Sequence, residues 1–319
     1  MECRANESKN ADIFGEKISV RRKKRISMNH FARGILVAVL FTVMSTAQTT
    51  TPVEYVVVRP VVNMFRTPTL DADVVSQSLY GTNVKLINAE GNWLHIKTAD
   101  DYTGWVQTDG LRKLEGKRYA DGVAFVKVSE SSANVYREPD VTAHAPLLNL
   151  PWESRLEVIS PKVDERGRWL RVRLAEGGEG FIQRGDVSSD QSTLDIPQTI
   201  ALAKRFMGVT YTWGGTSSFG FDCSGFVQML VRQRGVTLPR DASLQANWDG
   251  LLKVERKDLV AGDLLYFGED LTKVTHTGMY IGNGEFIHDT THERPMVQIS
   301  RLNDEPWTKL LVAARRVKQ

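Results

Sequence analysis

Asp222-Cys223-Ser224-Gly225-Phe226-Val227 is the stretch of sequence that decides the fold of the C-terminal part of this chain. Its two apolar residues, together with Leu230 and Val231, recur at i, i+1, i+4 and i+5, which predicts a buried helix. Cys223 would lie in the first turn of that helix, where unpaired N–H groups and the helix dipole favour an anion. We therefore expect a thiol pKa below the free value of about 8.5, a nucleophilic thiolate, and a Cys223 N–H that can stabilise an oxyanion.

A thiolate nucleophile needs a partner that holds or moves a proton, and histidine is suited to this near neutral pH. His276 begins one predicted strand, and His288 ends the next, after Gly282-Asn283-Gly284; together they predict a β-hairpin. A two-residue turn would place the histidines on opposite faces of the hairpin. A three-residue turn or a bulge would place them on one face, as diagonal neighbours about 7 to 8 Å apart at the backbone. The catalytic interpretation therefore requires the longer turn or a bulge.

The first 47 residues have the composition of an export signal. They contain nine Lys or Arg and four Asp or Glu, and all nine basic residues precede the apolar run from Gly34 to Met44. Ser45-Thr46-Ala47 is a small-x-small cleavage site, and the apolar run is shorter than the roughly 20 residues that span a bilayer. We expect a periplasmic or secreted protein that is not inserted in a membrane after cleavage. The alternative is an uncleaved membrane anchor, and translation could start at Met1 or Met28.

Cysteine count and charge narrow the class of protein further. Cleavage after Ala47 removes Cys3 and leaves Cys223 without a disulfide partner, so this thiol is either reactive or buried and inert. Residues 48–319 carry 32 basic and 34 acidic residues, which does not suggest a nucleic-acid partner. There is no paired cysteine or His-Glu-x-x-His, and His288-x-x-x-His292 lacks further ligands of suitable spacing. We expect a monomer without a metal or cofactor.

A duplicated domain precedes the Cys223 region. The 319 residues are 41% hydrophobic, which allows a sizeable core and two or three domains. Three short patterns recur in one order at shifts of 71 to 76 residues. These patterns are residues 63–68 and 134–139, 92–97 and 168–173, and 104–107 and 180–183. Alternating polarity predicts short strands in each copy, and Trp93, Trp105 and Trp169 are interpreted as packing residues of small barrels.

The polar segment 188–193 reads as a linker, and a helical pattern begins at Ile196 and stops at Gly208. Four motifs then follow in order: Tyr211-Thr212-Trp213-Gly214-Gly215, residues 221–226, Ala261-Gly262-Asp263-Leu264, and residues 276–282. They resemble the motifs of NlpC-type, papain-like cell-wall cysteine peptidases. Residues 53–115 and 123–188 resemble bacterial SH3-like domains, so the mature chain is similar to YkfC-like γ-D-glutamyl-L-diamino-acid endopeptidases.

The resemblance implies an α+β chain. Two small all-β SH3-like barrels at 48–118 and 119–189 would follow the signal and N-terminal extension at 1–47, and a papain-like catalytic domain would occupy 190–319. Cys223 would be the nucleophile, His276 the general base and then acid, and His288 the residue that orients His276. Tyr211 would help to stabilise the oxyanion.

The resemblance also implies a peptidoglycan-derived peptide substrate. Asp222 and Ser224 would contact its D-glutamyl unit, and Trp213 is a further predicted substrate-binding residue. Asp241 matches an acidic position associated with a free α-amine, so the enzyme would cleave the γ-D-glutamyl–diamino acid bond only of muropeptides with a free N-terminal L-Ala. The alternative is that Asp241 caps a helix or pairs with Arg240. Tyr102, in the first barrel, would help to wall off the cleft.

Two questions stay open at this point. The barrels either tether the enzyme to the wall or restrict its cleft to short peptides, and a barrel packed over Cys223 would favour restriction. The thioester intermediate could pass to an amine, which would make the protein an acyltransferase, and a non-catalytic wall-binding adaptor is a further alternative.

Overall fold

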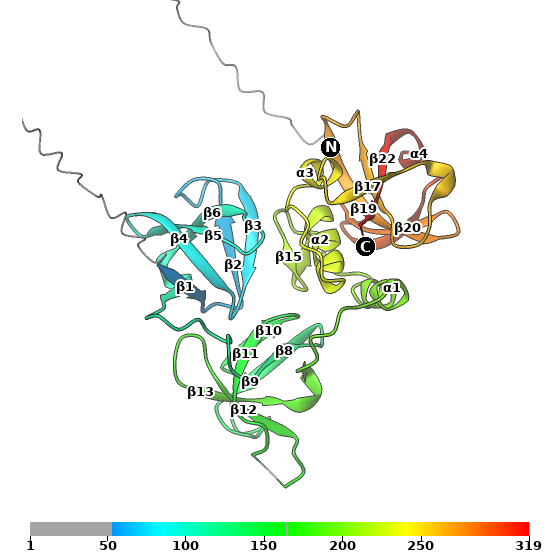
Figure 1. The fold of residues 1–319 in the computed structure, drawn as a ribbon. Helices are drawn as coiled ribbons and strands as arrows, with labels where there is room; N and C mark the ends of the chain where they lie inside the picture. The colour runs from blue at the N-terminus through cyan, green and yellow to red at the C-terminus, as the bar shows by residue number, and fades with distance from the viewer. Residues whose placement is uncertain (1–52, 164, 319) are drawn as a thin grey trace, which may run out of the picture. The chain divides into compact units, whose positions relative to one another are not determined.

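The computed structural model describes residues 53–163 and 165–318, so the predicted signal at 1–47 lies outside the described residues. Its first sheet has seven antiparallel strands in the order β3-β2-β6-β5-β4-β1-β7, drawn in blue and cyan in Figure 1. The strands are β1 (Glu54–Val57), β2 (Val61–Phe65), β3 (Val74–Leu79), β4 (Asn83–Glu90), β5 (Trp93–Lys97), β6 (Thr103–Gln107) and β7 (Leu111–Lys113).

Period-2 alternation in β5 explains the packing of this sheet. Leu94 and Ile96 are buried in its core, while Trp93 and His95 lie half-buried on the outer face. There the His95 ring stacks on Trp105 at a centroid distance of 4.8 Å. The tryptophans of the first barrel therefore pack on its outer face, whereas Trp169 in the second barrel is buried.

The second sheet repeats the topology of the first. Its order is β10-β9-β13-β12-β11-β8-β14, in which each strand takes the place of the strand seven positions earlier in the chain. The strands are β8 (Phe125–Val128), β9 (Ser132–Tyr136), β10 (Leu148–Pro151), β11 (Arg155–Ser160), β12 (Trp169–Arg173), β13 (Glu179–Gln183) and β14 (Val187–Ser188). This identity of order confirms the predicted duplication.

A helical element opens the third part of the chain. In α1 (Ile196–Arg205), the Asp195 side chain accepts from the Gln198 N–H and the Gln198 side chain accepts from the Asp195 N–H. This capping box fixes the start of the helix. The following elements are β15 (Thr216–Ser217), β16 (Gly220–Phe221), α2 (Cys223–Gln233) and α3 (Ala242–Ala246).

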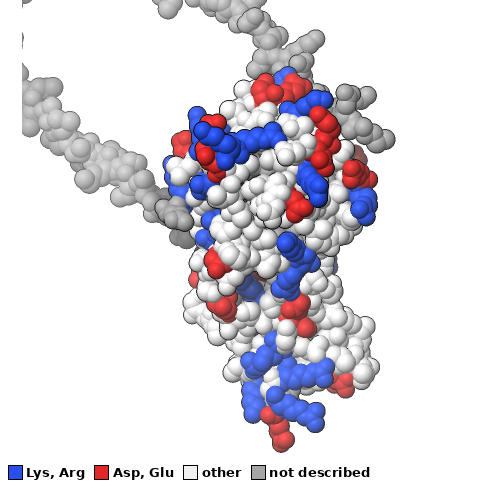
Figure 2. Space-filling model, turned by 90° about the vertical axis from the view of Figure 1, so that its right-hand side faces the viewer, with Lys and Arg blue, Asp and Glu red and all other residues white. Residues whose placement is uncertain are grey.

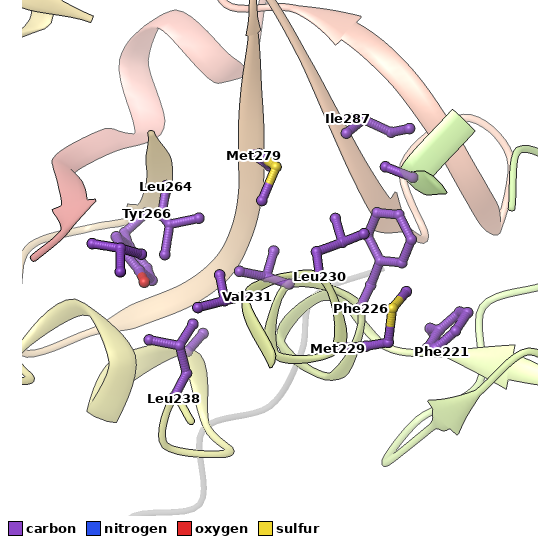
Figure 3. Close-up of a cluster of buried hydrophobic side chains, with 14 of the residues drawn as sticks. Phe221, Phe226, Met229, Leu230, Val231, Leu238, Leu264, Tyr266, Met279 and Ile287 are labelled. Carbon is purple, nitrogen blue, oxygen red and sulfur yellow. The ribbon is translucent and has the colours of Figure 1, made fainter. Parts of the chain in front are cut away.

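A six-stranded antiparallel sheet carries the rest, in the order β17-β22-β18-β19-β20-β21. Its strands are β17 (Leu251–Val254), β18 (Leu264–Gly268), β19 (Val274–Gly282), β20 (Glu285–Thr290), β21 (Met296–Arg301) and β22 (Leu311–Val317), with the short helix α4 (Trp307–Leu310) before β22. Helix α2 packs on one face of this sheet, and Figure 3 shows Leu230 among sheet residues that include Met279. The prediction of an α+β chain is confirmed.

Packed side chains join the barrels to each other and to the third part. Trp152, from the turn before β11, lies in the same core as α2 and meets Phe206 edge to face at 5.6 Å. Tyr80 of the first barrel lies in the core of the second and donates to Glu176 at 2.6 Å. A cavity of about 600 Å³ is lined by residues between Arg112 and Tyr119 of the chain and by Glu157 and Arg173 of the second barrel. It includes none of the predicted site residues.

Charges of both signs are interspersed on the face of the molecule shown in Figure 2. Among the described residues, no helix combines the length and the apolar composition needed to cross a membrane.

Candidate active site

Cys223 is the first residue of α2, as the sequence predicts. Asp222 is the N-cap, with an extended backbone, and its Oδ1 accepts from the Gly225 N–H at 2.7 Å. The Cys223 side chain is 7% exposed. The backbone N–H groups of Thr277 in β19 and of Ser224 face the thiol, so the nucleophile candidate lies against the strand that carries His276.

The pKa of this thiol differs from the sequence-based expectation. Burial and then the Asp222 carboxylate raise the pKa of Cys223 to about 12, while the Thr277 N–H, Arg240 and the Ser224 N–H act in the lowering direction. Desolvation of a nearly buried sulfur therefore outweighs the favourable helix terminus. The prediction of a lowered thiol pKa was therefore wrong for the unliganded protein, in which Cys223 is protonated at neutral pH.

The hairpin of β19 and β20 solves the register problem with a bulge. Asn283 and Gly284 both have positive φ, 54° and 75°, and form the two-residue turn between Gly282 and Glu285. The register then shifts between Gly282 and Tyr280, so that Met279 faces Ile287. Because the bulge offsets the two-residue turn, both histidines come to the same face.

The two histidines are in direct contact. His276 Nε2 and His288 Nδ1 are 2.7 Å apart, and His288 Nε2 is 2.9 Å from the Ser300 hydroxyl. Among the described residues, His276 Nδ1 has no hydrogen-bond partner. No hydrogen bond joins either histidine to the Cys223 thiol in this structure. If His276 Nε2–H donates to His288 and His288 Nε2–H donates to Ser300, His276 Nδ1 is left as a proton acceptor.

Aromatic rings surround this pair and keep it uncharged. Trp307 meets His276 at a centroid distance of 5.1 Å and His288 at 4.8 Å, and Phe267 lies 5.7 Å from His276. Burial, with a smaller effect of His292, lowers the pKa of His276 to about 3. Burial, then His276 and His292, lowers the pKa of His288 well below its ordinary value. Both imidazoles are therefore neutral near pH 7, and His276 Nδ1 is the nitrogen left to accept a proton.

The predicted oxyanion and substrate residues lie next to the helix terminus. The Tyr211 segment pairs in parallel with Phe221, and the Tyr211 N–H donates to Pro295 O at 2.9 Å. Trp213 is 62% exposed, and Gly214 at φ 74° lies so close to Val74 of the first barrel that a Cβ would approach its carbonyl oxygen to 2.7 Å. A glycine at 214 thus permits this approach of the barrel.

Asp222 and Ser224 are engaged in an internal network with Arg240. This guanidinium is 2% exposed, donates to both Asp222 oxygens at 3.0 and 2.6 Å, and donates to Ser224 Oγ at 2.8 Å. The Gly214 N–H adds a further bond to Asp222. Any contact of Asp222 or Ser224 with a substrate must therefore exchange one of these bonds.

Asp241 is bonded to the first barrel instead of to its own neighbours. It occupies the N-cap position of α3, but its side chain makes no capping bond, and Arg240 pairs with Asp222 instead. The Tyr102 hydroxyl donates to both carboxylate oxygens of Asp241, at 3.1 and 3.2 Å. The two side chains predicted to select the substrate therefore meet across 139 residues of sequence.

Three further contacts bind the first barrel to this site. Ser76 Oγ accepts from Arg240 Nε at 3.1 Å, Gln77 Oε1 accepts from the Thr216 N–H at 3.1 Å, and Asp100 accepts from Gln228 at 2.9 Å. Sequence reasoning missed Arg240, Ser300 and Trp307. The one local signal was the position of Arg240 beside Asp241.

No group of three or more His, Cys, Asp or Glu side chains within residues 53–163 and 165–318 is placed to hold a metal ion.

Comparison with known proteins agrees with this geometry. Residues 208–316 match the NlpC/P60 family, and residues 64–111 match the bacterial dipeptidyl-peptidase SH3 domain. The chain is 31% identical over 258 residues to a γ-D-glutamyl-L-lysine dipeptidyl-peptidase of Bacillus cereus, covering 76% of this chain and 74% of the relative. A protein of the same name from Bacillus subtilis is 30% identical over 262 residues, covering 77% and 82%.

A solved structure extends the likeness to three dimensions. The crystal structure of an NlpC/P60 family protein from Bacillus cereus superposes with a TM-score of 0.70 at 26% identity, covering 83% of this chain and 99% of the other. The similarity thus includes the barrels as well as the domain that carries Cys223 and the histidine pair. This chain belongs to the NlpC/P60 family.

Proposed function

We propose that this protein is a cysteine endopeptidase that cleaves the γ-D-glutamyl–diamino acid bond of cell-wall peptides bearing a free N-terminal L-Ala. The Tyr102–Asp241 contact, together with Cys223 at the start of α2 and the histidine pair, supports this proposal. The two Bacillus relatives, named for γ-D-glutamyl-L-lysine, support the bond that is cleaved.

The histidine pair supplies the base for the first step. His276 Nδ1 takes the thiol proton as Cys223 Sγ attacks the γ-carbonyl carbon, and His288 holds the ring through Nε2. Proton transfer must accompany the attack of the sulfur, because the Cys223 thiol is protonated before substrate binds. We assign stabilisation of the oxyanion to the Cys223 N–H and to Tyr211, whose backbone pairs with Phe221.

The later steps return the site to its starting state. The His276 imidazolium gives its proton to the departing amine, which leaves a thioester on Cys223. His276 then takes a proton from water, whose oxygen attacks the thioester. The γ-carboxyl product departs, and the thiol regains its proton.

Replacing His276 with alanine is expected to lower kcat about 10²- to 10⁴-fold with peptide binding retained, because a placed proton acceptor is lost. Steady-state kinetics and calorimetric binding of a minimal peptide measure the two quantities. His144→Ala, at an exposed histidine of the second barrel, is the matched control and should leave both unchanged. Wild-type turnover in His276→Ala would remove this residue from the mechanism.

The Asp241 carboxylate is the proposed partner of the substrate ammonium. It is half-buried, and its lone pairs are only partly used by the single Tyr102 hydroxyl. A charge-assisted bond to the ammonium would exclude peptides whose amine is blocked by a lactyl or acetyl group. Four contacts of the first barrel with this region favour restriction of the site over tethering as its role.

The test compares L-Ala-γ-D-Glu-diaminopimelate with its N-acetylated analogue, with products identified by mass spectrometry. Wild type is expected to cleave the free-amine peptide alone. Asp241→Asn should lower kcat/KM for it about 10- to 100-fold, mostly through KM, because a charged hydrogen bond is lost. Equal cleavage of both peptides by wild type would reject the selection.

The pH dependence of KM gives a second check on Asp241. Burial raises the pKa of Asp241 above its ordinary value, so the ionised form that attracts an ammonium is lost at a higher pH than for an exposed aspartate. KM should therefore rise on the acid side. Peptides that contain lysine and peptides that contain diaminopimelate are to be compared as substrates in the same assay.

The signal-like sequence at 1–47 supports a periplasmic or secreted enzyme.

A further inference from the structure

Ser300 of β21 ends a chain of three hydrogen-bonding side chains, and the proposed mechanism gives it no role. His276 Nε2 lies 2.7 Å from His288 Nδ1, and His288 Nε2 lies 2.9 Å from Ser300 Oγ. The three residues come from three neighbouring strands of one sheet, β19, β20 and β21. Each ring nitrogen of His288 therefore has a polar neighbour, and these two neighbours together decide which nitrogen of His288 carries the proton.

The strand register places the Ser300 hydroxyl on the face of the sheet that carries His288. Gln298 pairs with His288, and Ser300, two residues further along β21, pairs with Phe286. Alternate residues of a strand share a face, so Ser300 lies on the same face as His288 and Phe286. The contact of Ser300 with His288 is thus a diagonal one between adjacent antiparallel strands. Regular backbone pairing, and no loop, holds this hydroxyl at His288 Nε2.

Burial makes His288 dependent on this hydroxyl. His288 is 0% exposed, and the rings of Phe286 and Trp307 lie against it at centroid distances of 4.4 and 4.8 Å. Within the described part of the chain, Ser300 is the one hydrogen-bond partner of His288 Nε2. Ser300 itself is only half-buried, so water can accept its hydroxyl proton. A proton on His288 Nε2 therefore needs the oxygen of Ser300 as its acceptor.

Two arrangements of protons fit these distances. In the first, His276 Nε2–H donates to His288 Nδ1 and His288 Nε2–H donates to Ser300 Oγ, so that His276 Nδ1 has a lone pair. In the second, the Ser300 hydroxyl donates to His288 Nε2, His288 Nδ1–H donates to His276 Nε2, and His276 Nδ1 carries a proton. Both rings are neutral near pH 7 and hold one proton each, so the arrangements differ only in which nitrogen holds it.

The hydrogen bonds of the structure favour the first arrangement. It gives an acceptor to every ring N–H and leaves unbonded only the lone pair of His276 Nδ1. The second arrangement gives His276 an Nδ1–H that has no acceptor among residues 53–163 and 165–318. The Nε2–H form is also the more stable tautomer of a histidine side chain in isolation. When His276 takes up a second proton, both bonds of the first arrangement persist unchanged.

We infer, on the basis of the proposed function, that Ser300 is a positioning residue: by accepting the hydrogen bond from His288 Nε2–H, it holds both imidazoles in the Nε2–H form and leaves His276 Nδ1 able to take the thiol proton. Without the hydroxyl, both arrangements leave one N–H unpaired. The first leaves it on His288, which is fully buried, and the second leaves it on His276, which is less buried. Loss of Ser300 therefore favours the second arrangement, in which His276 Nδ1 is already protonated and cannot act as the base.

The direct test locates the protons without using a substrate. Long-range ¹H–¹⁵N spectra of the full chain at pH 7 distinguish protonated from unprotonated imidazole nitrogens, with the signals assigned by comparison with His276→Gln and His288→Gln. In wild type we expect Nε2 to be protonated and Nδ1 to be unprotonated in both rings. Ser300→Ala should shift His276 toward the Nδ1–H form. Ser300→Thr, which keeps the hydroxyl on an edge strand that suits threonine, should show the wild-type pattern.

Kinetics on the free-amine peptide give the second readout. Ser300→Ala is expected to lower kcat about 10- to 100-fold, the scale on which an unpaired buried N–H displaces an equilibrium. KM should change little, because Tyr102 and Asp241 are untouched. Ser300→Thr should restore kcat to near the wild-type value. Ser160→Ala removes a hydroxyl that donates to Lys162 O in the second barrel, and this control should leave both constants unchanged.

Three results would overturn the inference: a protonated Nδ1 in either ring of the wild-type protein, the same tautomers in Ser300→Ala as in wild type, or wild-type kcat in Ser300→Ala. The wild-type spectrum decides even where a variant misfolds. A merely structural Ser300 would lower the melting temperature of Ser300→Ala and leave the tautomers as they are. If the proposed function fails and no peptide is cleaved, the tautomer readout is still available, so the two failures are distinguishable.

Discussion

Replacing Cys223 with alanine is expected to reduce hydrolysis of the free-amine peptide by about 10⁴-fold or more, to the limit of detection. The thioester cannot form without the sulfur of Cys223. Binding should persist, because Tyr102 and Asp241 are untouched. Product formation followed by mass spectrometry and binding followed by calorimetry measure the two effects.

Cys223→Ser is the matched variant. It replaces the thiol with a hydroxyl of similar size at the first residue of α2. The Asp222 N-cap and its bonds to Arg240 remain in place, so folding should be preserved. Circular dichroism and the melting temperature check this. Serine is a far weaker nucleophile without a strong base, so its activity should also be close to zero. Turnover above about one per cent of wild type in either variant would exclude covalent catalysis by this residue.

The sequence predicted those features of the site that depend on neighbouring residues. The apolar spacing after Cys223 places the thiol at a helix terminus, and the structure has α2 begin there. The hairpin argument left two ways to bring His276 and His288 together. The structure uses the bulge, because positive φ at both Asn283 and Gly284 favours a two-residue turn, and the extra residue must then be accommodated in β19.

Features that depend on distant segments could not be predicted. Burial of the thiol is set by packing of α2 on the sheet, and it reverses the pKa direction that the helix terminus alone implies. The Tyr102–Asp241 contact was predicted only through resemblance to a family, because no local pattern links residues 139 positions apart.

Replacing Arg240 with methionine is expected to lower the free energy of unfolding by about 3 to 5 kcal/mol, the largest stability effect in the site. Methionine keeps the apolar stem but leaves Asp222 as a buried carboxylate without its bidentate partner. It also removes the donor to Ser76 Oγ, so the first barrel loses its hydrogen bond to the residue 240 side chain. Urea unfolding, with the midpoint and slope both recorded, measures the change.

Two matched variants identify the cause of this loss. Arg171→Met breaks an exposed pair with Glu179 on the second barrel and should cost no more than about 1 kcal/mol, because solvent screens such pairs. The double variant Arg240→Met/Asp222→Asn should recover part of the stability, since the unpaired charge is gone. A cost for Arg240→Met no greater than that of Arg171→Met would mean that water reaches Asp222.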